Sequence, residues 1–183
     1  MFSKQKVRNK FLLLRKRKYF EVNDNFFKPL IRIINSEKKR KISLYYPSNY
    51  EVNTLSLLKN LGNKKKFSTL LPKILSNGKM KFISWKFFEP LAVNRFGFLE
   101  PESNGKSIEP ELMVVPLLAF DKFKNRLGYG KGYYDKFLSE YILKKKDILT
   151  IGVAFSFQQY KKIPNIKSDV KLDYILTEKG FIN

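Results

Sequence analysis

The sequence predicts a single α/β domain that covers residues 1–183. A strand-like run at 41–47, a helical pattern at 53–62 and a second strand-like run at 66–72 form a βαβ unit, whose crossover favours parallel strands. The run 111–120 is almost continuously apolar, as expected of a strand that is covered on both faces. No linker is long enough to divide the chain, and 183 residues with 43% hydrophobic content can bury one core.

The first third of the chain predicts two helices besides the one in the βαβ unit. Ser3 can cap a helix that runs to about Tyr19 and places Val7, Phe11 and Leu14 on one face. Residues 25–36 have a helical pattern, but Pro29 implies either a break or a late start of that helix.

The rest of the chain predicts further strands and one helix. Residues 79–85, 148–155 and 172–176 are expected to be strands, whereas residues 87–101 are expected to be irregular because proline and glycine interrupt them. The helix that follows the glycine-rich stretch is expected to turn these residues inward: Tyr134, Phe137, Leu138, Tyr141 and Ile142.

Composition excludes several kinds of chemistry. The chain has no cysteine and no histidine, so it can form no disulfide, thiolate nucleophile, imidazole base or histidine-ligated zinc site. Any metal must be bound by oxygen, which favours magnesium or a similar hard cation.

The net charge of +21 has two interpretations. The charge could bind a nucleic acid or an anionic lipid, or it could belong to a solvated surface rich in lysine. The run at 64–66 lies between periodic segments, which favours the solvated surface. The basic residues 1–20 contain little serine and are typical of an ordinary helix rather than a targeting segment, and no apolar run is long enough to span a membrane.

The stretch RLGYGKGYYD, Arg126 to Asp135, places three glycines within five positions. It lies between a predicted strand and a predicted helix, an arrangement that offers backbone N–H groups to phosphate. Arg126 and Lys131 add positive charge at the same turn. The pattern is neither a P-loop nor the dinucleotide fingerprint, and a purely structural tight turn remains the alternative.

Residues 114–138, VVPLLAFDKFKNRLGYGKGYYDKFL, resemble the signature of the 5-formyltetrahydrofolate cyclo-ligase family. The resemblance extends over nearly the whole chain. It includes the K-x-x-x-R pair of Lys4 and Arg8, Glu51 in YEVNT, the blocks LLP and FGFLEP, Gln158, and SDVKLDYILTE near the C-terminus. The central motif is specific, and the others follow in the order of the family.

The resemblance implies a fold and an activity. The fold would be a three-layer α/β/α sandwich around a largely parallel, mixed sheet. The activity would be the conversion of 5-formyltetrahydrofolate into 5,10-methenyltetrahydrofolate with ATP and Mg²⁺, through phosphorylation of the formyl oxygen and release of ADP and phosphate. The expected partners are therefore small molecules, a reduced folate and ATP, with no nucleic acid and no membrane. A monomer in the cytoplasm is expected.

The resemblance also implies the site residues. ATP would contact Lys4, Arg8, Arg126, Leu127, Gly128, Tyr129, Gly130, Lys131, Gly132, Tyr133 and Tyr134, of which Arg126, Lys131 and Tyr133 would be catalytic. The folate would contact Tyr46, Glu51, Phe96 and Tyr133, and Mg²⁺ would be bound by Asp135 and Asp173. Without the resemblance, the aromatic residues could be core side chains, Glu51 a solvated acid in a first helical turn, and each aspartate a cap or a surface residue.

Three departures from the family pattern concern loop geometry. Lys124 stands where a turn glycine is common, Tyr50 replaces a small residue before Glu51, and Leu117–Leu118 is bulkier than the common version, which contains glycine. Two other functions remain open: a basic nucleic-acid-binding protein, and a folate-binding relative without catalysis. The first lacks any RNA-binding signature, and the retained charged residues argue against the second.

Overall fold

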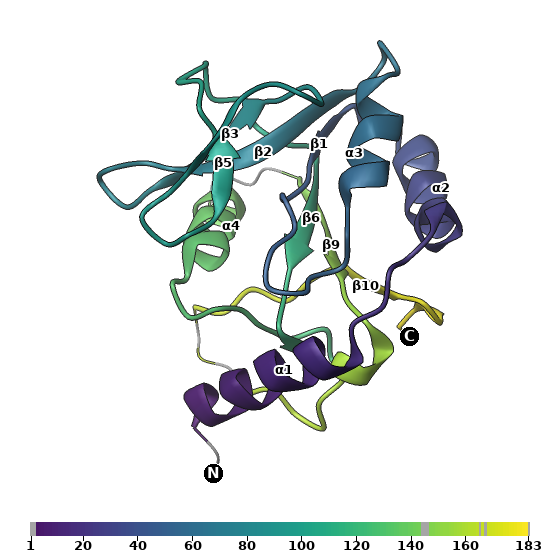
Figure 1. Ribbon diagram of the computed structural model, residues 1–183, viewed down its shortest axis with the longest axis vertical. Coiled ribbons are helices and arrows are strands. Elements are labelled where there is room, and N and C mark those ends of the chain that lie inside the picture. Colours follow the sequence, from purple (N-terminus) through teal and green to yellow (C-terminus); the bar gives the residue numbers. More distant parts are fainter. Residues whose placement is uncertain (1–2, 144–146, 165, 167, 183) are drawn as a thin grey trace.

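A seven-stranded sheet forms the centre of the protein (Figure 1). The computed structural model describes residues 3–143, 147–164, 166 and 168–182. The strand order is β11-β10-β9-β6-β1-β2-β3, and every neighbouring pair is parallel except at the two edges, where β11 and β3 run antiparallel to their neighbours. The strands are β1 (Lys41–Ser43), β2 (Ser68–Ile74), β3 (Met80–Ser84), β6 (Leu112–Pro116), β9 (Leu149–Val153), β10 (Tyr174–Thr177) and β11 (Gly180–Phe181). The predicted α/β class with a largely parallel, mixed sheet is confirmed.

The βαβ unit predicted from the sequence is present. Helix α3 (Leu55–Gly62) connects β1 to β2, and these strands pair in parallel. Leu57, Leu58 and Leu61 of α3 are buried, which explains why the apolar spacing of this segment indicated a helix against the sheet.

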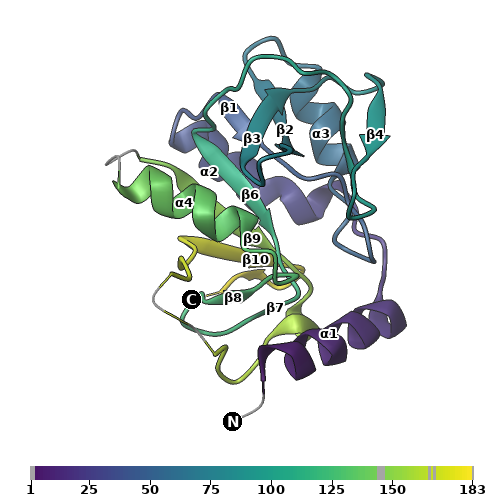
Figure 2. The same ribbon diagram turned by 90° about the vertical axis from the view of Figure 1, so that its left-hand side faces the viewer.

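Helices cover both faces of the sheet (Figures 1 and 2). Leu30 of α2 (Lys28–Ser36) shares a buried cluster with Val114 of β6, whereas Leu138 of α4 (Tyr133–Leu143) shares another cluster with Val115. Because successive residues of a strand point to opposite faces, α2 and α4 lie on opposite sides of β6. This is the expected three-layer sandwich.

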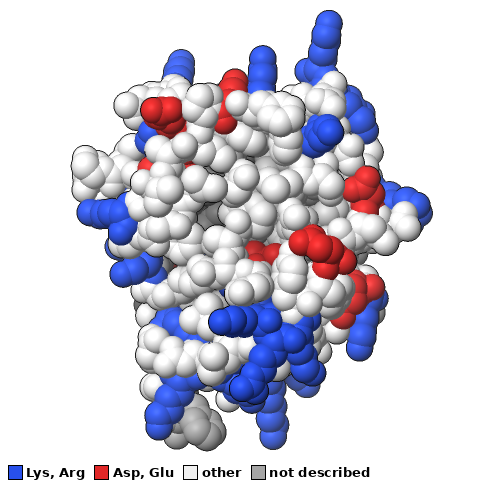
Figure 3. All heavy atoms as spheres, in the orientation of Figure 1, with Lys and Arg blue, Asp and Glu red and all other residues white. Residues whose placement is uncertain are grey.

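Helix α1 (Lys4–Lys18) lies at one end of the sheet rather than on a face (Figure 1). Ser3 caps it, as predicted, by accepting a hydrogen bond from the Lys6 backbone N–H at 3.3 Å. Val7 and Phe11 are buried among residues of the segment that follows β6. Many Lys and Arg side chains gather over α1 in Figure 3, and the other face of the helix anchors it to the carboxyl end of β6.

Two local predictions, for residues 87–101 and for Ile142, need correction. Residues 87–101 are not wholly irregular, because β4 (Leu91–Val93) and β5 (Leu99–Pro101) form an antiparallel hairpin. Asn94 makes the turn of this hairpin by accepting hydrogen bonds from the backbone N–H groups of Phe96 and Phe98. Ile142 does not point inward: it is 57% exposed in the last turn of α4.

The predicted strand at 111–120 is divided into two shorter strands. Strand β6 ends at Pro116, and Ala119–Phe120 (β7) pairs with Arg126–Leu127 (β8) in a small antiparallel ribbon. Lys124, in the connection between β7 and β8, has φ 63°, a left-handed conformation that a glycine adopts more readily than a lysine.

The start of α2 agrees with the late start that Pro29 suggested. A 3₁₀ turn at Asp24–Phe27 precedes α2, and Pro29 lies in the first turn of α2. At this position the missing N–H of proline costs nothing, because an N–H there would have no partner within the helix. A second 3₁₀ turn, Ser156–Gln158, follows β9. Within the described residues, no helix is long and apolar enough to cross a membrane.

Candidate active site

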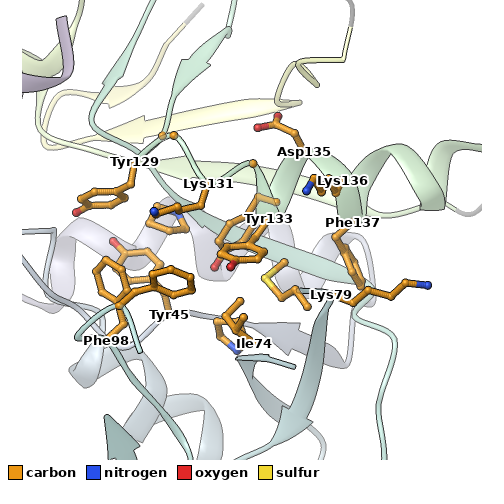
Figure 4. A pocket seen from close by; sticks show the side chains of 18 of the residues that line it. Tyr45, Ile74, Lys79, Phe98, Tyr129, Lys131, Tyr133, Asp135, Lys136 and Phe137 are labelled. Carbon is orange, nitrogen blue, oxygen red and sulfur yellow. The ribbon is translucent and has the colours of Figure 1, made fainter. Parts of the chain in front are cut away.

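A cavity of about 1040 Å³ opens beside the carboxyl ends of the parallel strands. Its walls come from α1, the hairpin β4–β5, the glycine-rich stretch and α4. In Figure 4, Tyr129, Lys131 and Tyr133 lie on one side of this cavity, and Tyr45 and Phe98 lie opposite. Open α/β sheets bind ligands at this edge, so the cavity is the first place to look for a functional site.

The glycine turn, residues 128–132, connects β8 to α4 and lines the cavity. Gly130 and Gly132 have φ values of +94° and +70°, which side chains rarely adopt. A Cβ atom at Gly130 would also lie 3.0 Å from Cζ of Arg8. At Gly130 glycine is favoured both because the chain turns with a positive φ and because the Arg8 guanidinium approaches its backbone.

The two cations at the start of α1 both reach the cavity. Nε of Arg8 donates to the carbonyl oxygen of Gly128 at 3.0 Å, and Nζ of Lys4 lies 2.6 Å from Oδ2 of Asp169. The structure therefore brings Lys4, Arg8 and the glycine turn together, although they lie more than a hundred residues apart in the sequence.

Arg126 and Asp135 form a partly buried ion pair at the base of the turn. Nη2 of Arg126 lies 2.7 Å from Oδ1 of Asp135, and Nη1 donates to the carbonyl oxygen of Val170 at 2.6 Å. Burial lowers the pKa of the Arg126 guanidinium, while the charges of Asp135 and Asp169 oppose that shift. Two carboxylates thus lie close to the same cation.

Asp173 does not join them. Its Oδ2 accepts hydrogen bonds from the backbone N–H and the hydroxyl of Thr150, both at 2.7 Å, and the residue does not line the cavity. It fixes the start of β10 against β9. The second carboxylate near Arg126 is that of Asp169, which lies four residues before Asp173 in the sequence and was not predicted as a site residue. Among the described residues, no group of three or more acidic side chains forms a ready-made metal cluster.

Glu51 lies in a loop and not in a first helical turn, because α3 begins only at Leu55. The side chain is 6% exposed. Oε2 accepts a hydrogen bond from the Ser48 N–H at 2.9 Å, and Oε1 accepts one from the Tyr129 hydroxyl at 2.9 Å. Burial raises the pKa of the Glu51 carboxyl, and the positive charge of Arg15 opposes the shift.

Aromatic rings line the part of the cavity next to Glu51. The rings of Phe96 and Tyr133 are 5.8 Å apart between centroids, and Nζ of Lys131 lies 5.0 Å from the centroid of Phe96. Tyr46 also lines the cavity and contacts the ring of Trp85 edge-on. All the predicted folate residues therefore border one space.

Two predicted nucleotide residues are mainly part of the core. The side chain of Leu127 belongs to the cluster of Val7 and Phe11, so only its backbone is free to contact a ligand. Tyr134 packs against the core cluster that includes Leu138, and burial raises the pKa of its hydroxyl. Gln158 donates to two backbone carbonyl groups after β6 and has a structural role.

A glycine turn with nearby cations, lining a cavity at the carboxyl end of parallel strands, is typical of α/β proteins that bind phosphorylated ligands. The family model makes this class specific. The chain belongs to the 5-formyltetrahydrofolate cyclo-ligase family, whose model matches residues 1–178, and the predicted resemblance is confirmed.

Individual relatives agree with the family. A 5-formyltetrahydrofolate cyclo-ligase of Haemophilus influenzae is 30% identical over 152 residues, which are 80% of this chain and 80% of that protein. The cyclo-ligase of Mycoplasma genitalium is 33% identical over 140 residues, 75% of this chain and 72% of that protein. The solved structure of a 5,10-methenyltetrahydrofolate synthetase from Aquifex aeolicus has a TM-score of 0.75 and 31% identity, and covers 97% of this chain and 91% of its own.

Proposed function

We propose that this protein converts 5-formyltetrahydrofolate into 5,10-methenyltetrahydrofolate at the expense of ATP, with Mg²⁺, ADP and phosphate as in the expected reaction. One observation supports this proposal above the others. The anion-binding glycine turn and the aromatic region around Glu51 border the same cavity, so a nucleotide phosphate and a pterin ring can meet there.

The nucleotide phosphates would lie against the glycine turn. Backbone N–H groups of Gly128, Gly130 and Gly132 can approach phosphate oxygens, since no Cβ intervenes. Arg8 uses its Nε to hold the Gly128 carbonyl group, and Nη1 makes an exposed 3.4 Å contact with Oε1 of Gln5, so Nη2 is the nitrogen most readily available for phosphate. Lys131 extends from the middle of the turn into the cavity (Figure 4).

Mg²⁺ would be held by Asp135 and Asp169 together with phosphate oxygens. The donor set fits this ion, because magnesium usually takes one or two carboxylates and completes its shell with phosphates and water. Arg126 and Val170 engage Oδ1 of Asp135, which leaves Oδ2 for a cation. When bound, the ion would neutralise part of the phosphate charge. Asp173 is left out of this site because it does not line the cavity and its Oδ2 is held by Thr150.

The folate would occupy the aromatic part of the cavity. Glu51 would accept hydrogen bonds from the N–H groups of the pterin edge, which only its ionised form can do with both oxygens. Phe96 and Tyr46 would contact the flat ring system. Tyr133, the first residue of α4, would lie beside the formyl group, between folate and nucleotide.

The reaction then needs positioning and charge stabilisation rather than a protein nucleophile. The formyl oxygen attacks the terminal phosphorus of ATP, and ADP leaves. The N10 nitrogen next attacks the activated carbon, and the phosphate departs with the former formyl oxygen as the ring closes. Lys131 and Arg126 would stabilise the negative charge on the transferred group, so the absence of histidine and cysteine is no obstacle.

The test is incubation of the purified protein with 5-formyltetrahydrofolate, ATP and Mg²⁺ while the absorbance of the methenyl product is followed. We expect product only when nucleotide and divalent cation are both present. Product formed without nucleotide, or no product under any condition, would contradict the proposal.

A further inference from the structure

We propose that Arg15 is a positioning residue. Through the Tyr129 hydroxyl it would hold the glycine turn and the Glu51 carboxylate in one arrangement, so that binding of either substrate strengthens binding of the other. The identity of the two substrates rests on the proposed function. The arrangement itself consists of Arg15, Tyr129 and Glu51, which we call the relay.

Arg15 is a charged side chain in a place where an apolar one would pack. It follows Val7 and Phe11 at spacings of four along the buried face of α1 and is 0% exposed. Among the described residues it forms no ion pair within 4 Å, and its Nε has no hydrogen-bond partner. Burying a guanidinium in this way is costly. Packing alone therefore does not explain an arginine here.

The outer nitrogens of Arg15 reach three separate segments. Nη1 donates to the Leu117 carbonyl oxygen at 3.3 Å, after β6. Nη2 donates to the Asn49 carbonyl oxygen and to the Tyr129 hydroxyl, both at 2.5 Å. One guanidinium thus contacts both the loop that carries Glu51 and the glycine turn.

Tyr129 passes the contact on to Glu51. Its hydroxyl has one proton, and because Arg15 can only donate, that proton is directed at Oε1 of Glu51 at 2.9 Å. Burial raises the pKa of the Tyr129 hydroxyl, so the tyrosine stays neutral and keeps this donor. Any shift of the turn at Tyr129 moves the group that orients the carboxylate.

The loop on the Glu51 side needs this support, because its backbone is strained. Asn49 and Tyr50 have φ values of 47° and 60°, and a tyrosine rarely adopts the left-handed region because its Cβ then crowds the following carbonyl oxygen. Arg15 holds the carbonyl group of Asn49, and Ser48 holds the other oxygen of Glu51. Without the bond from Arg15, the loop can relax and carry the carboxylate away.

The relay therefore joins the two halves of the cavity. A nucleotide that orders the glycine turn also orders Tyr129 and, through it, Glu51. A folate that engages Glu51 restrains the turn in the same way, since the coupling between two binding sites is reciprocal. Arg8 assists from the other end of α1, where it holds the Gly128 carbonyl group.

The main test uses Tyr129→Phe, which removes one hydroxyl and keeps the ring that packs against Phe98. The matched control is Tyr160→Phe, because Tyr160 packs edge-on against Phe11 of the same helix and does not line the cavity. Calorimetry gives the dissociation constant of 5-formyltetrahydrofolate with and without a non-hydrolysable ATP analogue. We expect the analogue to tighten folate binding in the wild-type protein and in Tyr160→Phe. In Tyr129→Phe we expect binding about tenfold weaker, with most of the tightening lost.

A second measurement needs no ligand. Amide hydrogen exchange should become faster in Tyr129→Phe in segments 47–52 and 127–132 together, and Arg15→Lys should act similarly because the forked guanidinium is lost. Unchanged exchange in both segments, or tightening by the analogue equal to that of Tyr160→Phe, would overturn the relay. The relay would also be overturned if the ATP analogue left the folate affinity of the wild-type protein unchanged. A wild-type protein that makes no methenyl product contradicts the proposed function instead, and the exchange measurement still decides on the relay.

Discussion

The close approach of Arg8 to Gly130 permits a quantitative test of the glycine turn by Gly130→Ala. The φ of +94° strains any side chain, at a cost of about 1–3 kcal/mol in the free energy of unfolding. The added Cβ would also lie 3.0 Å from the guanidinium carbon of Arg8, so the guanidinium must shift by a few tenths of an ångström. If Arg8 binds phosphate, this shift weakens a charged hydrogen bond worth about 1.5–3 kcal/mol, and the ATP requirement rises by up to roughly 10- to 100-fold.

Gly180→Ala is the matched control for the strain. Its φ is +97°, no atom lies within 4 Å of the added Cβ, and the residue is the first of β11, directly after the turn from β10, and does not line the cavity. Both variants should lose several degrees of Tm. Only Gly130→Ala should require more ATP in the assay for the methenyl product.

A double-mutant cycle separates displacement of Arg8 from distortion of the turn. In the Arg8→Ala background there is no guanidinium to displace, so adding Gly130→Ala should raise the ATP requirement little further. Fully additive effects of the two substitutions would refute this reasoning. An unchanged ATP requirement in Gly130→Ala alone would refute it too.

Three further outcomes are expected. Burial raises the pKa of Glu51 above 4.5, so the folded protein holds this proton more tightly than the unfolded chain does, and the free energy of unfolding should fall as pH rises above 4.5 through the raised pKa. Glu51→Gln should abolish that fall in denaturant titrations. The same variant should raise the folate requirement more than the ATP requirement. Asp135→Asn should weaken turnover at limiting Mg²⁺, whereas Asp173→Asn should lower Tm and leave the Mg²⁺ requirement unchanged. Equal Mg²⁺ requirements in the two variants would mean that Asp135 does not bind the ion. At matched ionic strength, Arg8→Ala should raise the ATP requirement about tenfold, whereas neutralising Lys64–Lys66 together should not; similar losses would mean a diffuse basic surface.

Most elements of the fold were predictable because local signals and the tertiary structure agree. The cap at Ser3, the leucine spacing of α3 and the apolar run of β6 each appear in the sequence as well as in the structure. The hairpin β4–β5 was missed because its strands have only three residues each and because Pro90, Gly97 and Pro101 punctuate the segment. Pairing across the Asn94 turn, rather than propensity, makes them strands.

The site was predictable only as far as residue types allow. Family motifs identified Lys4, Arg8 and Glu51, but two aspartates four positions apart, Asp169 and Asp173, look alike until hydrogen bonds to Thr150 distinguish them. Arg15 was missed because a helix rich in Lys and Arg gives no reason to single out one cation. Its spacing of four from Phe11 was the available signal.

The sequence separations across the cavity have a consequence for how the protein acquires its activity. Lys4 meets a partner 165 residues away, and Arg8 meets one 120 residues away, whereas β1 and β2 pair across a single short helix. Long-range closures of this kind form slowly, because chain entropy must be lost before the contact forms. During synthesis, α1 must wait until the segment that carries Asp169 has emerged before both substrates have a place to bind. Nascent chains that already contain most of the sheet should therefore be inactive, and the competent pocket should be among the last features to mature.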